Sequence, residues 1–128
     1  YICKTMGLFS KDKGETINWK ILETEAQLTE FFELSMSKPI AIFKHSTRCS
    51  LSSMVKSRLE RGWNINDTDI DMYYLDILNG RNISNKIASI FNVEHQSPQL
   101  IVLQQGKVLY HASHGEIDAG VLKERIGK

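Results

Sequence analysis

The sequence predicts an α/β protein whose central mixed sheet is flanked by helices on both faces. Three observations predict this fold class. Strand-like apolar segments alternate with amphipathic helical segments from residue 19 to residue 91, as in parallel strands joined by crossover helices. Two further strand-like segments surround Gly106, which indicates a closing antiparallel hairpin. Residues 40–43 form a continuous apolar run, which is typical of a central strand buried on both faces.

The first two elements are a short strand over residues 19–22 and a helix that begins after Thr24. Thr24 and Gln27 have the spacing of a capping box, in which each side chain bonds the backbone of the other. The dipeptide at 38–39 ends the helix because proline cannot continue it. The residues expected on its inner face are Leu28, Phe31, Phe32 and Ser35.

The next two elements are the buried strand 40–43 and a helix that starts at Cys49. A polar stretch, residues 44–48, separates them. Gly62 is the expected end of the helix, because glycine is common just after a helix. The apolar residues that we expect to share the inner face of this helix are Leu51, Met54, Val55 and Leu59.

The second half of the chain continues the pattern. We expect a second central strand at 72–75, a helix at 83–91, hairpin strands at 99–103 and 107–111, and a final helix at 118–126. The apolar positions that define the two helices are Ile83, Ile87, Ile90, Phe91, Leu122 and Ile126.

Length and composition predict one globular domain. The chain has 128 residues, with 41% hydrophobic and 24% charged residues. We divide it into a flexible lead-in over residues 1–15 and a single domain over residues 16–128. Because Met6 begins a segment that resembles a natural start, residues 1–5 are interpreted as upstream or non-native sequence.

Charge and hydropathy exclude two classes of partner. The net charge is +1 and the basic residues are interspersed with acidic ones, so we expect no binding to nucleic acid. No apolar stretch approaches the roughly 20 residues that span a bilayer, so we expect no membrane partner. The two cysteines, Cys3 and Cys49, are too few for a secreted disulfide scaffold, and we expect a cytoplasmic protein.

Cys49 lies where the buried strand gives way to a helix. The N-terminus of a helix exposes backbone N–H groups and a positive partial charge, which stabilise a thiolate, the attacking species in disulfide exchange. A buried structural cysteine is the alternative, but such cysteines usually lie within apolar runs. Cys49 instead has Thr47, Arg48 and Ser50 beside it. This environment favours a reactive cysteine.

Ser52 occupies the position at which a Cys-x-x-Cys motif carries its second, resolving thiol. A hydroxyl cannot form a disulfide, so Cys49 would form a mixed disulfide that an external thiol must release. Serine at the start of a helix is also ordinary capping. The signal gains weight because a buried strand precedes it and an amphipathic helix follows it.

Ser97-Pro98 precedes a predicted strand. The order of elements resembles the thioredoxin fold, in which a cis-proline at this place faces the cysteine and the preceding backbone pairs with a substrate chain. A proline that simply begins a strand is the alternative. Together with the cysteine, this resemblance favours the cis isomer.

The remaining candidates are weaker. His45 could act as a base, but its geometry relative to Cys49 is not determined by helical spacing. His111 and His114 lack further ligands for a metal. The acidic segment 67–71 lacks the glycine and the glutamate of a calcium loop. We therefore predict no metal site.

Four segments of the chain resemble the monothiol bacilliredoxins of the YtxJ family. The two most specific runs are KHSTRC at 44–49 and HQSPQ at 95–99, and the resemblance covers about residues 17–125. It implies a thioredoxin-like fold and the removal of bacillithiol, a small cysteine-containing sugar thiol, from protein mixed disulfides. The four segments are residues 42–52, 74–76, 81–85 and 91–99.

The resemblance makes Cys49 the catalytic nucleophile, and Ser97-Pro98 would shape the substrate groove. It implies bacillithiolated client proteins as partners and bacillithiol as co-substrate, with no tightly bound cofactor. Two alternatives stay open: a glutaredoxin-like iron–sulfur or thiol carrier, and a redox-inert adaptor with the same fold. The predicted substrate-binding residues are Thr47, Arg48, Ser50, Ser52, Ser97 and Pro98.

Overall fold

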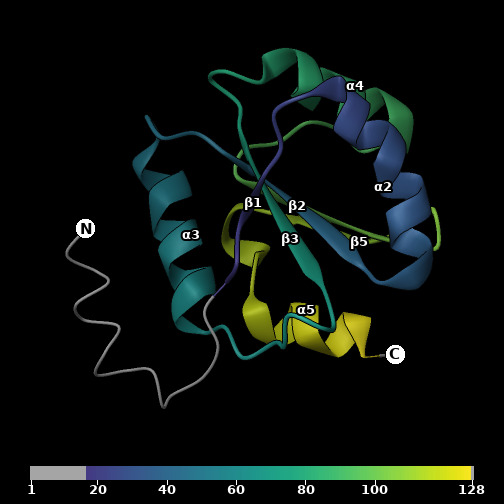
Figure 1. The fold of residues 1–128 in the computed structure, drawn as a ribbon. Helices are drawn as coiled ribbons and strands as arrows, with labels where there is room; N and C mark the ends of the chain where they lie inside the picture. The colour runs from purple at the N-terminus through teal and green to yellow at the C-terminus, as the bar shows by residue number, and fades with distance from the viewer. Residues whose placement is uncertain (1–16, 128) are drawn as a thin grey trace.

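The structure, a computed structural model, describes residues 17–127 (Figure 1). The predictions for residues 1–15, including the reading of residues 1–5 and Cys3 as non-native, lie outside the described residues. The elements in chain order are β1 (Lys20–Ile21), α2 (Glu25–Ser37), β2 (Ile40–His45), α3 (Ser50–Arg61), β3 (Asp71–Asp76), α4 (Arg81–Phe91), β4 (Gln99–Gln104), β5 (Lys107–Ser113), the 3₁₀ helix η2 (His114–Glu116) and α5 (Ala119–Ile126).

The five strands form one mixed sheet in the order β1-β3-β2-β4-β5. Strands β1, β3 and β2 are parallel, as expected for strands that are joined by crossover helices. Strand β4 runs antiparallel to β2, and β5 antiparallel to β4. The mixed sheet and the closing hairpin that the sequence predicts are therefore confirmed.

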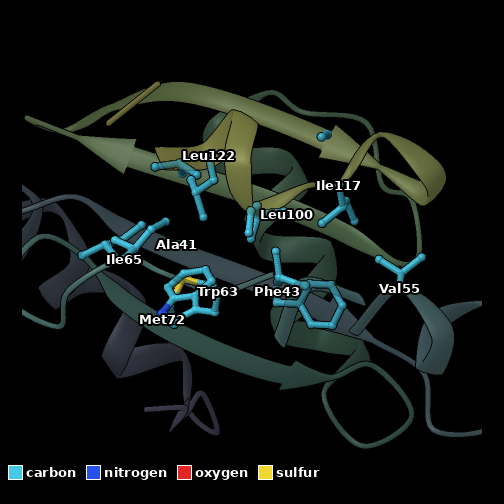
Figure 2. Packing of buried hydrophobic residues seen from close by; sticks show 14 residues of the cluster. Ala41, Phe43, Val55, Trp63, Ile65, Met72, Leu100, Ile117 and Leu122 are labelled. Carbon is cyan, nitrogen blue, oxygen red and sulfur yellow. The ribbon is translucent and has the colours of Figure 1, made fainter. Parts of the chain in front are cut away.

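Helices cover both faces of the sheet (Figure 1). Helices α3 and α5 pack on one face, here called the α3 face, and α2 and α4 pack on the other, the α2 face. Every residue of β2 is buried, and its side chains alternate between the two faces. Figure 2 shows Ala41 and Phe43 of β2 within the core of the α3 face, where Leu100 and Leu122 also lie.

Helix α2 begins as predicted. The Thr24 side chain accepts a hydrogen bond from the backbone N–H of Gln27, and the Gln27 side chain accepts one from the Thr24 N–H, at 2.9 Å. Leu28, Phe31 and Ser35 are buried, whereas Phe32 is 38% exposed and packs against Phe91 of α4. This capping box fixes where the helix begins, and hence which side chains reach the core.

Besides the inward position expected for Phe32, two expectations need correction. The predicted polar stretch after residue 43 is wrong at its start, because β2 continues through Lys44 and His45, which are both buried. The expected inner face of α3 is also partly wrong: Leu51 and Met54 are 42% and 66% exposed. The residues of α3 that face the sheet are Ser52, Val55 and Leu59. Ser52 belongs to this inner face because its hydroxyl has buried polar partners.

Candidate active site

Three loops meet at the edge of the sheet where β2 ends. Because β2 and β4 are antiparallel and Lys44 pairs with Gln99, the segment 46–49 after β2 lies beside the segment 94–98 before β4. The third loop follows β5, and the backbone N–H of His114 donates to the C=O of Pro98 at 3.1 Å. The topology therefore brings the predicted cysteine and the predicted proline to one edge.

Cys49 is the N-cap residue of α3. Its backbone N–H donates to the C=O of Ser46 and its C=O accepts from the N–H of Ser53, both at 3.1 Å. The thiol is free and partly exposed, and it makes no capping hydrogen bond to the helix. The backbone thus holds the cysteine at the helix N-terminus, where the residue stays partly exposed.

Ser52, at the position of a resolving thiol, is fully buried beneath this loop. Its Oγ lies 2.6 Å from Nδ1 of His45 and accepts a hydrogen bond from the Ser46 N–H at 3.2 Å. Ser46 therefore joins the two parts of the site, because its N–H binds Ser52 while its C=O binds Cys49. The Ser52 hydroxyl therefore connects β2 with the cysteine loop, a role that its spacing from Cys49 in the sequence does not reveal.

The surroundings of His45 favour the neutral form of its imidazole. Burial lowers the pKa of its imidazole below the usual value, and the nearby Lys56 ammonium lowers it further, while Asp76 and Glu60 act in the opposite direction. The ring stacks on Phe43 at a centroid distance of 5.9 Å. A neutral imidazole with Nδ1 unprotonated can accept a hydrogen bond from the Ser52 hydroxyl, which suits the short distance between Nδ1 and Oγ.

Lys44, the residue before His45, points to the opposite face of the sheet and is fully buried. Its Nζ lies 3.3 Å from Nδ1 of His95, and the Ser84 Oγ lies 3.0 Å from the same nitrogen. Burial lowers the pKa of Lys44 to about 8. None of the ion pairs found within residues 17–127 includes Lys44, so this ammonium is buried beside a histidine and without a carboxylate.

His95 is the acceptor for that ammonium. Burial lowers the pKa of its imidazole, and the charges of Lys44 and Arg81 lower it further. A neutral ring with Nδ1 unprotonated satisfies one donor of Lys44. Because His95 belongs to the loop before Pro98, the pair connects the end of β2 with that loop.

The loop before β4 is also held by Gln99. The Gln99 side chain donates to the C=O of Glu94 at 2.9 Å and accepts from the Gln96 N–H at 3.4 Å. The bond between Ser97 and Pro98 is cis, as the sequence analysis favoured. Within the described part of the chain, neither the backbone N–H and C=O of Ser97 nor its buried Oγ has a protein partner. Ser97 therefore has hydrogen-bonding groups that no residue within 17–127 uses.

The structure brings the predicted site residues to one edge but at different depths. Thr47, Arg48 and Ser50 are exposed around the partly exposed cysteine, whereas Ser52 is fully buried. Pro98 is buried and Ser97 is partly buried. Sequence reasoning missed the pairing of Lys44 with His95 and the support from Ser84 and Gln99. The available signal was that KHSTRC and HQSPQ, the runs carrying the family resemblance, contain both partners.

No helix within residues 17–127 is both long enough and apolar enough to cross a membrane. In the same range, no three side chains of His, Cys, Asp or Glu gather as metal ligands would.

Solved structures with the same arrangement establish the fold. A protein described as a candidate oxidoreductase with a thioredoxin fold is 27% identical, with a TM-score of 0.71 over 84% of this chain and 92% of that one. The thioredoxin of Malassezia sympodialis is 13% identical, with a TM-score of 0.66 over 89% and 91%. Thioredoxin NaTrxh from Nicotiana alata is 19% identical, with a TM-score of 0.63 over 88% and 93%. The predicted thioredoxin-like fold is confirmed.

A family model described as monothiol bacilliredoxin BrxC matches residues 20–122, which span all five strands and the segment around Cys49. Family and fold together support a role in thiol redox chemistry. The match covers most of the chain and agrees with the resemblance carried by its two specific runs, so this chain belongs to the monothiol bacilliredoxin family.

Proposed function

We propose that this protein is a thiol-disulfide oxidoreductase that removes bacillithiol from protein mixed disulfides through Cys49. The observation that carries the proposal is a free thiol at the N-terminus of α3, with the hydroxyl of Ser52 buried where a resolving thiol would stand. An enzyme with this arrangement has one thiol with which to exchange. It can take over an adduct, but it cannot resolve that adduct within the site.

The reaction takes place in two exchanges. The Cys49 thiolate attacks the bacillithiol sulfur of the modified client, the client–bacillithiol disulfide breaks, and the client thiolate leaves and takes up a proton. Cys49 now carries bacillithiol as a mixed disulfide. The thiolate of a second bacillithiol, or of another reductase, attacks the bacillithiol sulfur of this adduct and releases Cys49. With bacillithiol as the reductant, the oxidised product is bacillithiol disulfide.

Ser97 supplies the substrate-facing backbone in this proposal. Its backbone N–H and C=O, which no residue within 17–127 binds, can pair with the client chain as an added strand would, which brings the client–bacillithiol disulfide to Cys49. The exposed Thr47, Arg48 and Ser50 then border the bound thiol. We further propose that the protein acts in the cytoplasm on bacillithiolated client proteins, with bacillithiol as co-substrate and no tightly bound cofactor.

A turnover assay tests the proposal. A client protein modified with bacillithiol is mixed with the reduced enzyme and excess bacillithiol, and release of the client thiol is followed. Cys49→Ser should abolish turnover, whereas Cys3→Ser should retain it. Full activity in Cys49→Ser would rule out the mechanism. Coloured protein from an anaerobic preparation would instead favour the iron–sulfur carrier, and an unreactive Cys49 would favour the adaptor.

A further inference from the structure

A groove runs along one flank of α3, between this helix and the 3₁₀ helix that follows β5. Its volume is about 400 Å³, and it is bordered on its other side by Gly115 after β5. We call it the α3 groove. Its lining residues are Leu51, Ser53, Met54, Val55, Ser57, Arg58, Arg61 and Gly115.

The end of the α3 groove that adjoins the active site is apolar. Leu51 follows Cys49 by two residues, and Met54 lies one turn further along the helix. Leu51 and Met54 are 42% and 66% exposed, because neither residue faces the sheet. The core of the α3 face uses Val55 and Leu59 instead. Leu51 and Met54 are therefore available for contact with another molecule.

The far end of the α3 groove is basic. The Arg58 guanidinium donates to the backbone C=O groups of Gly115 and Ile117, which fixes its position. Arg61 takes part in none of the ion pairs found within residues 17–127. Among residues 17–127, no acidic side chain lines the groove. The occupant that complements this surface has an apolar group near the cysteine and a negative charge at the other end.

The length of the groove indicates what kind of molecule could span it. Leu51 and Arg61 are ten residues apart on one helix, which corresponds to about 15 Å at the helical rise of roughly 1.5 Å per residue. An extended chain covers that distance in about four to five residues. A small thiol bound at Cys49 would not reach Arg61, whereas a polypeptide that presents its cysteine to Cys49 would.

We propose that the α3 groove binds the client protein itself, along the segment next to the modified cysteine. The preferred client carries an apolar side chain within about two residues of that cysteine and an acidic side chain about four to six residues from it. This inference rests on the proposed function, because it identifies a class of client for the same cysteine. Specificity then comes from the α3 groove, while the chemistry remains at the N-terminus of α3.

Three bacillithiolated peptides test the proposal. One is a blocked cysteine without an extension, and the other two carry a leucine near the cysteine and either glutamate or lysine at the distant positions. The glutamate peptide should have a kcat/KM about three- to fivefold above that of the lysine peptide, the size of effect expected from one partly exposed ion pair. Both orders of the extension, before and after the cysteine, are measured.

Two variants locate the effect in the groove. Arg61→Gln should remove the difference between the glutamate and lysine peptides, and Met54→Gln should lower kcat/KM for both extended peptides about threefold. Neither variant should affect the blocked cysteine. Lys123→Gln, which removes an exposed charge from the last turn of α5, and Met36→Gln, which removes an exposed methionine from α2, are the matched controls. Both controls should behave as the wild type.

The outcomes separate the groove from the chemistry. Turnover of the blocked cysteine with no preference for glutamate would overturn the groove proposal and leave the proposed function standing. If no peptide is turned over, the proposed function fails. Peptide binding by the groove is then tested separately, by fluorescence anisotropy of serine-containing peptides mixed with Cys49→Ser, and a preference for glutamate over lysine would support it. A dimer in sedimentation equilibrium that Met54→Gln dissociates would make the groove a contact between two copies, and would overturn its use by clients.

Discussion

Two neighbouring residues at the end of β2 support opposite walls of the site in different ways. On the α3 face, His45 binds the buried hydroxyl of Ser52, which lies beneath the cysteine loop. On the α2 face, Lys44 binds His95, which lies in the loop before Pro98. One pair is neutral and closely bonded, whereas the other contains a buried charge that burial disfavours.

This difference shows how one strand supports two loops that are far apart in sequence. The neutral pair keeps the cysteine loop in place at little energetic cost, because the buried Ser52 hydroxyl, Nδ1 of His45 and the Ser46 N–H are all hydrogen-bonded. The charged pair is destabilising in itself, since no carboxylate within residues 17–127 forms an ion pair with Lys44. We interpret Lys44 as a residue retained for positioning the proline loop rather than for stability, and four changes test this contrast.

The largest effect is expected from Lys44→Met, which removes the buried charge. A pKa lowered from 10.5 to about 8 corresponds to roughly 3 kcal/mol of destabilisation at neutral pH. After the loss of the bond to His95, the free energy of unfolding should rise by about 1–3 kcal/mol in urea denaturation at pH 7. Amide exchange of residues 94–97 should nevertheless become faster, because the loop loses an anchor.

The stability difference between Lys44→Met and the wild type should depend on pH. The folded protein releases the Lys44 proton near pH 8 and the unfolded chain near pH 10.5, so the wild type regains stability between these values. Lys44→Met should lack this gain, and its advantage should vanish by about pH 10.5. Ile42→Met, on the same face of β2, is the control and should keep the gain. A variant that is less stable than the wild type at pH 7 would refute the contrast.

Ser52→Ala should act in the opposite direction. It leaves the Ser46 N–H and Nδ1 of His45 without their buried partner, which costs about 1–3 kcal/mol of unfolding free energy. Because Ser46 also holds the backbone of Cys49, the rate of Cys49 alkylation should change too. Ser53→Ala, at an exposed neighbouring position, should stay within about 0.5 kcal/mol of the wild type. Equal effects of the two substitutions would exclude a special role for Ser52.

Acidification should weaken the α3 face through His45. Its pKa is lowered in the folded protein, so below pH 6.5 the unfolded chain takes up a proton that the folded protein resists. Stability that is present above pH 6.5 is therefore lost as the pH falls. His45→Phe should reduce this loss, measured by urea denaturation at pH 7 and pH 5. Tyr74→Phe keeps an aromatic ring beside His45 and should retain the loss; an unchanged loss in His45→Phe would contradict the assignment.

The smallest effect is expected from Lys56→Met. Lys56 lowers the pKa of His45 and also forms an ion pair with Glu60 at 2.8 Å. Removal of this ammonium should raise the pKa of His45, as followed by NMR titration of its ring protons. Lys86→Met removes an exposed lysine of α4 that pairs with Glu25, and should leave the titration of His45 unchanged. A lower pKa of His45 in Lys56→Met would contradict the assignment of Lys56 as a group that lowers this pKa.

Much of the fold could be predicted because its signals are local. The capping box at Thr24, the apolar run that begins at Ile40 and the glycine turn at Gly106 each determine one element from a few neighbouring residues. The junction of strand and helix placed Cys49 at a helix N-terminus for the same reason. Parallel pairing then followed from the alternation of strands and helices.

The supporting contacts could not be predicted because they join distant parts of the chain. Lys44 and His95 are 51 positions apart, and a lysine after an apolar run ordinarily indicates a solvent-exposed loop. Hydropathy predicts that Met54 is buried and Ser52 exposed, but the structure shows the reverse. Ser52 can be buried because its hydroxyl bonds the buried imidazole of His45. Hydropathy alone therefore misplaces residues whose burial depends on a specific polar partner.

Intact mass spectrometry tests the central claim most directly. The reduced Cys3→Ser protein is mixed with a bacillithiolated client in the absence of free bacillithiol, and both proteins are weighed. We predict one bacillithiol on Cys49, located by peptide mapping, and an equal amount of client returned to its free thiol. A client that keeps its adduct while Cys49 stays unmodified would contradict the proposed mechanism.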